Sequence, residues 1–285
     1  MPVAGRSNGP VAGRCNRAVV GRFKLALRSV QAGIRVGAIS VVLGTTLLAQ
    51  PPQGRGGPPP SGRAGAPVDL TGTWVSVVTE DWEARMMPPV KGDYTTIEQV
   101  MTPEARKVAD SWQPSMDGRC EAYGVGGVMR VPRRLRISWQ DDNTLKIETD
   151  AGAQTRLLRF APPAGGGTPT RTLQGYSVAE WQRGGGQQDA FLGRGVGAAG
   201  QRWGGLKVIT TNVLTGWLRT NGVPYGERAT VTEHFTRFTH PVAGDWFVVT
   251  TVVEDPQYLT GPFITSSNFK KEPNDSKFRP TPCKS

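Results

Sequence analysis

Histidine and cysteine are scarce in this chain of 285 residues, which contains two histidines and three cysteines. Protein metal sites usually need three or four ligands, and two histidines on one helix face are a clear sequence signal for such a site. His234 and His240 do not have the spacing of such a pair. We therefore predict no metal site.

Acidic residues are absent before Asp69, whereas seven of the 34 Lys and Arg residues precede Ala49. This uneven distribution accounts for most of the formal net charge of +11. If residues 1–49 are removed, 27 basic and 23 acidic residues remain, and the net charge falls to +4. So small a charge does not favour binding to nucleic acid, and we expect no nucleic-acid partner.

The chain also lacks an apolar run long enough to cross a bilayer, which takes about 20 residues. Val36–Ala49 is uncharged over 14 residues and follows a basic segment. This arrangement is typical of a secretory signal peptide. We predict that residues 1–49 are such a signal, that the mature protein is periplasmic or secreted from a bacterium, and that no stable membrane span remains. The alternative is that this run is a buried part of the domain.

Removal of the signal discards Cys15 and leaves Cys120 and Cys283. Two cysteines in an oxidising compartment commonly form a disulfide, which here would tie the end of the chain to the early part of the domain. The alternative is a pair of free thiols.

Pro, Gly, Gln, Arg and Ala make up almost all of residues 50–68. This composition buries too little apolar surface to offset the entropy of ordering, so we predict a disordered linker and then a single domain at 69–285. A Gly-rich stretch at 183–205 predicts a mobile insertion. Residues 195–200 match the motif Gly-x-Gly-x-x-Gly. A nucleotide-binding motif of this type follows a strand and begins a helix, and neither is predicted here, so we expect no nucleotide or other cofactor.

Short runs rich in β-branched and aromatic residues, separated by turn-forming residues, predict eight strands. A helix is predicted at Thr102–Trp112, where Thr102 can cap the helix and Pro103 suits its first turn. The tail at 256–285 contains five prolines and predicts irregular structure. The predicted strands are Leu70–Thr79, Val128–Trp139, Thr144–Asp150, Gln154–Phe160, Thr172–Gln182, Leu206–Thr220, Val223–Thr239 and Asp245–Glu254.

Sequential strands without alternating helices predict an all-β, mainly antiparallel domain with one short helix. Eight strands are enough to close a small barrel, and closure leaves no exposed strand edge. We therefore favour a barrel of about eight strands. A β-sandwich is the alternative that fits the same pattern.

The start of the domain, Asp69-Leu70-Thr71-Gly72-Thr73-Trp74, resembles the Gly-x-Trp opening of the first strand in lipocalin-type barrels. In that family the Trp closes the base of the barrel, so the resemblance implies the same place for Trp74. The chain departs from the family in its extra helix and its long tail. Residues 69–285, including WQDDNTLKIETDAG at 139–152, also resemble secreted bacterial proteins of unassigned function, which implies export.

A small-molecule pocket is usually lined by apolar and aromatic side chains with a few polar anchors. Several polar residues lie on predicted strands, and several aromatic residues lie where strands end and could rim a barrel mouth. These candidate ligand-binding residues are Glu148, Glu180, His234, Trp217, Tyr225 and Tyr258.

Two acidic pairs, Glu80-Asp81 and Glu254-Asp255, each follow a strand rich in Val and Thr. If these strand ends meet at one rim, the four carboxylates raise one another's pKa and can act as acid and base. The alternative is that they pair with basic residues such as Arg85, Arg130 and Arg219.

Three functions fit these patterns. The first is an exported lipocalin-like protein that binds a small, largely apolar ligand. The second is a structural or interaction module of the cell envelope with a filled core. The third is a barrel-type isomerase or hydrolase that uses the rim carboxylates. The ligand-binding protein and the enzyme each need a cavity, whereas the structural module does not. Clustered carboxylates with raised pKa values would favour the enzyme over the ligand-binding protein.

Overall fold

The computed structural model describes residues 60–161, 167–183 and 204–285. The predicted signal peptide at 1–49, the first part of the predicted linker, and positions 184–203 of the predicted insertion lie outside these ranges. The Gly-rich motif at 195–200 is therefore also outside them.

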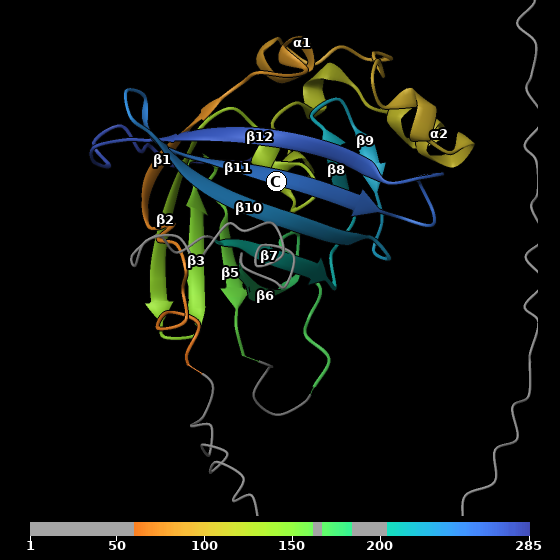
Figure 1. Ribbon diagram of the computed structural model, residues 1–285. Helices are drawn as coiled ribbons and strands as arrows, with labels where there is room; N and C mark the ends of the chain where they lie inside the picture. The colour runs from red at the N-terminus through yellow and green to blue at the C-terminus, as the bar shows by residue number, and fades with distance from the viewer. Residues whose placement is uncertain (1–59, 162–166, 184–203) are drawn as a thin grey trace, which may run out of the picture. The chain divides into compact units, whose positions relative to one another are not determined.

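The described chain forms a closed barrel of nine strands (Figure 1). The order around the barrel is β1-β12-β11-β10-β7-β6-β5-β3-β2, and pairing of β2 with β1 closes it. This confirms the all-β prediction and decides for the barrel over the sandwich. The barrel strands are β1 (Gly72–Val77), β2 (Arg134–Asp141), β3 (Thr144–Thr149), β5 (Thr155–Arg159), β6 (Tyr176–Arg183), β7 (Gly204–Thr211), β10 (Thr230–His240), β11 (Gly244–Glu254) and β12 (Phe263–Lys271).

All neighbouring barrel strands are antiparallel except β5 and β6, which pair in parallel through Leu158 and Ser177. Each of the eight predicted strands overlaps one barrel strand. The ninth, β12, lies in the tail that we predicted to be irregular, and that prediction is wrong for Phe263–Lys271. The five tail prolines flank this segment without interrupting it, so every backbone N–H within it can enter the sheet.

The strand β12 has a partner on both sides, because it pairs with β11 and with β1. Beyond it, the short β13 (Thr281–Pro282) pairs in parallel with β4 (Ala151–Gly152). The end of the chain therefore closes the barrel and then lies along its outside.

Side chains alternate across a strand, so every second residue points into the barrel. Trp74 is fully buried there, its ring packs edge-on against Phe247 at 4.8 Å between centroids, and its indole N–H donates to the Leu70 carbonyl at 2.9 Å. The Gly-x-Trp segment thus opens the first strand of a barrel. The apolar interior comprises Leu70, Trp74, Leu135, Ile137, Leu145, Ile147, Leu158, Leu206, Val208, Phe235, Phe247, Val249 and Phe269.

A polar layer crosses the interior next to this apolar part. Arg156 and Glu233 form a bidentate ion pair, with nitrogen–oxygen distances of 3.0 and 2.5 Å, and both side chains are fully buried. The Ser177 and Thr210 hydroxyls lie 2.7 Å apart beside them along the strands. The layer also includes the buried residues Thr149, Thr251 and Ser267.

Residues 60–68 cover the mouth at which β1 begins, which we call the N-terminal mouth. The Arg63 amide donates to the Asp142 carbonyl at 2.8 Å, and the Trp181 indole donates to the Gly62 carbonyl at 2.6 Å. Our prediction of disorder over 50–68 is therefore wrong for 60–68. Composition alone did not reveal that the Trp181 ring and the β2–β3 turn supply partners for this backbone.

The opposite mouth, at which β1 ends, is covered by helices and a hairpin, and we call it the capped mouth (Figure 1). The predicted helix is present as α2 (Pro103–Asp110), and the Thr102 hydroxyl accepts the Ala105 amide as its cap. The other covering elements are α1 (Trp82–Met86), the hairpin β8 (Gly216–Arg219) and β9 (Val223–Tyr225), and the 3₁₀ turns η1 (Glu98–Val100), η2 (Pro114–Met116), η3 (Cys120–Tyr123) and η4 (Val128–Arg130).

The hairpin β8–β9 corrects two predicted strand bounds. The predicted strand 206–220 covers most of β7 and all of β8, and the predicted strand 223–239 covers β9 and most of β10. Each is divided because the chain leaves the barrel to form the hairpin. Asn212 adopts a left-handed φ of 53° just after β7, which ends that strand. Likewise, the predicted strand from Val128 begins as η4, and β2 starts only at Arg134.

Cys120 and Cys283 lie at disulfide distance, with Cα atoms 4.9 Å apart, as predicted. The surrounding backbone is paired as well, because the Cys120 amide donates to the Lys284 carbonyl at 3.0 Å and the Lys284 amide donates to the Gly118 carbonyl at 2.8 Å. Within the described ranges, none of the helices has the length and apolar character needed to cross a membrane.

Candidate functional site

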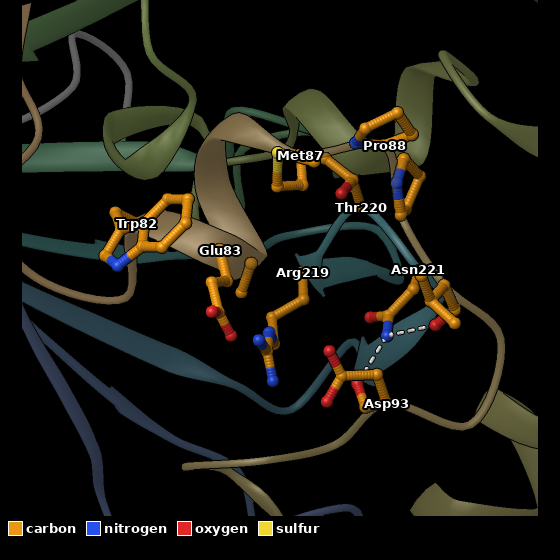
Figure 2. Close-up of a pocket in the computed structure, with 11 residues that line it drawn as sticks. Trp82, Glu83, Met87, Pro88, Asp93, Arg219, Thr220 and Asn221 are labelled. Atoms are coloured by element: carbon orange, nitrogen blue, oxygen red, sulfur yellow. Dashed lines mark hydrogen bonds between the residues drawn. The ribbon is translucent and has the colours of Figure 1, made fainter.

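A groove of about 290 Å³ lies on the capped mouth, between the segment that starts with α1 and the turn that follows β8 (Figure 2). One wall is mainly apolar and the other is polar. The lining residues are Trp82, Glu83, Ala84, Met87, Pro88, Pro89, Val90, Asp93, Arg219, Thr220 and Asn221.

The apolar wall follows from the local sequence. Asp81 takes a left-handed φ of 49° and turns the chain into the five-residue α1. Two consecutive prolines, Pro88 and Pro89, then prevent the helix from continuing, and Met87 before them is extended. The large apolar side chains of this segment stay unusually exposed, at 58% for Trp82, 56% for Met87 and 60% for Val90.

Asn221 holds the two walls together. Its side chain is buried, and its amide donates to the Val90 carbonyl at 3.1 Å and to the Asp93 carbonyl at 2.6 Å (Figure 2). Because one side chain fixes both carbonyls, the α1 segment keeps its distance from the β8–β9 hairpin. The groove is therefore preformed.

Three buried arginines lie next to the groove, and Arg219 also lines it. Arg85 comes from α1, Arg130 from η4 and Arg219 from β8, and their exposed fractions are only 9%, 6% and 7%. Figure 2 shows the Arg219 side chain directed into the groove, with Glu83 and Asp93 on either side in this view.

Each arginine has part of its hydrogen-bonding capacity satisfied. Arg85 donates from Nε to the Arg130 carbonyl at 2.8 Å, and Arg219 donates from Nη1 to the Thr95 carbonyl at 2.6 Å. Arg130 pairs with Asp81 at 3.0 Å. Nη1 of Arg85 and Nη1 of Arg130 are buried without a hydrogen-bond partner among the residues that the structure describes.

All three arginines line a small recess of about 20 Å³. The recess and the groove share Ala84, Arg219 and Thr220 in their walls. A small recess lined by three arginines thus shares part of its wall with the larger groove.

Burial and mutual repulsion perturb these groups. Desolvation, followed by the charge of Arg130, lowers the pKa of Arg85 to about 10, so Arg85 still carries its charge at neutral pH. Burial and Arg130 also lower the pKa of Arg219. The pKa of Asp93 is lowered mainly by hydrogen bonds from Thr95, with a smaller effect of Arg219, and this carboxylate is ionised at neutral pH.

The structure does not bring the two predicted acidic pairs together. Glu80 accepts the Ser266 amide at 2.8 Å, and Ser266 pairs with Thr250, four residues before Glu254 on β11. Asp81 pairs with Arg130, which is the alternative that the sequence left open. Asp255 is buried and accepts the amide of Gly226 at 2.6 Å, so it stabilises a turn.

Three of the predicted ligand-binding residues lie on the outer face of the barrel. Glu148 pairs with Arg136 at 3.0 Å, and this contact lowers its pKa. His234 lies 3.2 Å from the Gln182 side chain, and Glu180 is exposed in register with Lys207. Because Phe235 and Glu233 point inward, their neighbour His234 must point outward.

The predicted rim aromatics are at the capped mouth but do not line the groove. Tyr225 is fully buried, and burial raises its pKa. Trp217 packs with Trp112 and Ala122, and Tyr258 packs at the edge of the core under the cap. Trp217 and Tyr225 instead build the hairpin that carries Arg219.

A second cleft, of about 410 Å³, lies at the N-terminal mouth near Trp139 and Trp181. Its lining contains no buried polar side-chain atom that lacks a partner among the described residues. It therefore offers less for a ligand to recognise than the groove does.

Over the described part of the chain, no three His, Cys, Asp or Glu side chains are grouped so that they could hold a metal ion. Known proteins add nothing to this geometry. Comparison with protein families, with curated proteins and with solved structures found no match.

From the sequence, Arg85, Arg130 and Arg219 were predicted only as partners for the acidic pairs, and the groove was not predicted. The three arginines are far apart in the chain and approach one another only through the tertiary fold. The one local signal was the exposed run Trp82–Val90, which contains large apolar residues next to two prolines.

Proposed function

We propose that this chain is an exported, lipocalin-like binding protein that takes a small, largely apolar ligand in the groove of the capped mouth. The observation that carries the proposal is the exposed apolar wall of Trp82, Met87 and Val90 on a preformed groove of about 290 Å³. Clustered exposed apolar side chains commonly mark binding sites, and a pocket of this kind usually combines apolar walls with a few polar anchors.

Two further features support this proposal. The barrel interior is lined by buried side chains, including three phenylalanines and the Arg156–Glu233 pair, which favours a ligand site outside it. The Cys120–Cys283 pair is at disulfide distance, which suits the oxidising environment of an exported protein.

Binding of the neutral fluorescent probe N-phenyl-1-naphthylamine to residues 50–285 tests the proposal. We expect saturable binding that Val90→Asp weakens at least about tenfold, because a buried apolar contact contributes roughly 1.5 kcal/mol and a carboxylate adds a desolvation cost. Ile264→Asp is the matched control, since Ile264 is 58% exposed on the outer face of β12, away from the groove.

Equal affinities of the wild type and Val90→Asp would contradict the groove as the binding site. Absence of saturable binding would favour the structural module of the cell envelope instead.

A further inference from the structure

Resting on the proposed function, we propose that the ligand of the groove is a monocarboxylate, whose carboxylate enters the recess between Arg85, Arg130 and Arg219 while its apolar part lies along Trp82, Met87 and Val90. Three features of the recess support this ligand: its charge balance, its size, and the walls that it shares with the groove.

The charge balance of the recess is positive. Among the three arginines, Arg130 alone has a carboxylate within ion-pair distance, Asp81 at 3.0 Å, over the described residues. Arg85 feels Glu80 and Asp81, and Arg219 feels Asp93 and Asp81, only through longer-range attraction. A negative group in the recess would therefore offset repulsion between the charges of three buried arginine residues.

The unsatisfied donors point to an acceptor in the same place. Arg85 and Arg130 each have a buried Nη1 without a partner among the described residues, and both side chains line the recess. Leaving a buried charged donor without an acceptor is costly, whereas a carboxylate can accept from two such donors at once.

The size of the recess suits a small head group. A volume of about 20 Å³ holds one or two atoms the size of a water oxygen. The oxygens of a planar carboxylate fit this space. Because Ala84, Arg219 and Thr220 line both the recess and the groove, we place the rest of the ligand in the groove.

The acidic residues of the groove disfavour a ligand with a second negative charge. Glu83 and Asp93 line it beyond the arginines, and Asp93 is ionised at neutral pH. A dicarboxylate would bring its second carboxylate towards these groups. The arrangement therefore favours one acidic end and one apolar end, and it disfavours a dianion of the same length.

Isothermal titration of the mature protein, residues 50–285, tests this inference with three probes: decanoate, 1-decanol and decanedioate. We expect decanoate to bind at least about tenfold more tightly than either of the others, because a hydrogen bond to a charged group is worth about that factor or more. Arg85→Met should reduce the affinity for decanoate to that for decanol and leave decanol binding within about twofold.

The matched control is Arg136→Met, which removes an arginine from the outer face of β2 and should change neither affinity. If Arg85→Met does not fold, Arg219→Gln replaces it with the same expectation, because Arg219 also lines both cavities.

The outcomes separate this inference from the proposed function. Equal binding of decanoate and decanol would overturn the carboxylate site and leave the apolar groove standing. Loss of decanol binding in Arg85→Met would show a structural role of Arg85 and also contradict the inference. If neither probe binds, both the proposed function and the inference fail.

Discussion

Inside the barrel, the guanidinium of Arg156 on β5 pairs with the carboxylate of Glu233 on β10, and neither side chain has any exposed surface. Removing two charges from water costs several kcal/mol, and the attraction between them offsets this cost only while both are present. Substitution of either residue alone is therefore destabilising, although the intact pair contributes little to the free energy of unfolding.

We expect Glu233→Leu to lower the free energy of unfolding by about 3–5 kcal/mol, because it leaves the Arg156 charge buried and unpaired. The double variant Arg156→Met, Glu233→Leu should recover most of this loss, since both charges are gone. Urea denaturation of the single and double variants measures the coupling. Additive losses in the double variant would contradict a direct interaction between the two side chains.

The same pair shows the limit of inference from the sequence at the scale of the residue. Alternation along β10 places His234 and Glu233 on opposite faces of the strand. It could not reveal that Glu233 is the inward one, because a buried carboxylate is tolerated only through its partner 77 residues away. The recess was not predicted for a similar reason, because its three arginines are distant in the sequence and approach one another only in the fold.

At the scale of the element, helices and strands were predicted correctly where interactions within a few residues of sequence determine them. The predicted cap at Thr102 is present, and the predicted strand Thr144–Asp150 is present as β3. By contrast, β12 was missed because its partner strands, β1 and β11, determine its conformation, and the prolines around it suggested irregular chain.

Thr102 joins two elements of the cap, and its loss should be measurable. Its hydroxyl accepts the Ala105 amide at 3.1 Å at the start of α2 and donates to the Gln257 carbonyl at 3.1 Å in the segment after β11. We expect Thr102→Ala to lower the free energy of unfolding by about 1–2 kcal/mol, as for other capping residues. Thr102→Ser keeps the hydroxyl and should retain most of the stability; equal losses in the two variants would contradict the capping role.

At the scale of the whole molecule, the Cys120–Cys283 pair closes a loop of 163 residues. A crosslink over so long a loop restricts the unfolded chain, and it contributes about 3–5 kcal/mol when the native state is unstrained. We expect Cys120→Ser, Cys283→Ser to lower the urea midpoint of the oxidised protein to the value of the reduced wild type. Identical midpoints for oxidised wild type and the double variant would show that the bond contributes nothing.

The pairing of β1 with β12 has a consequence for the order in which the protein can be made. The first barrel strand starts at Gly72 and the strand that closes the barrel next to it ends at Lys271. Until β12 has been synthesised, both β1 and β11 present unpaired edges to the surroundings. Completion of the barrel thus waits for Phe263–Lys271, and a product shortened before Phe263 leaves two unpaired strand edges that favour aggregation or degradation.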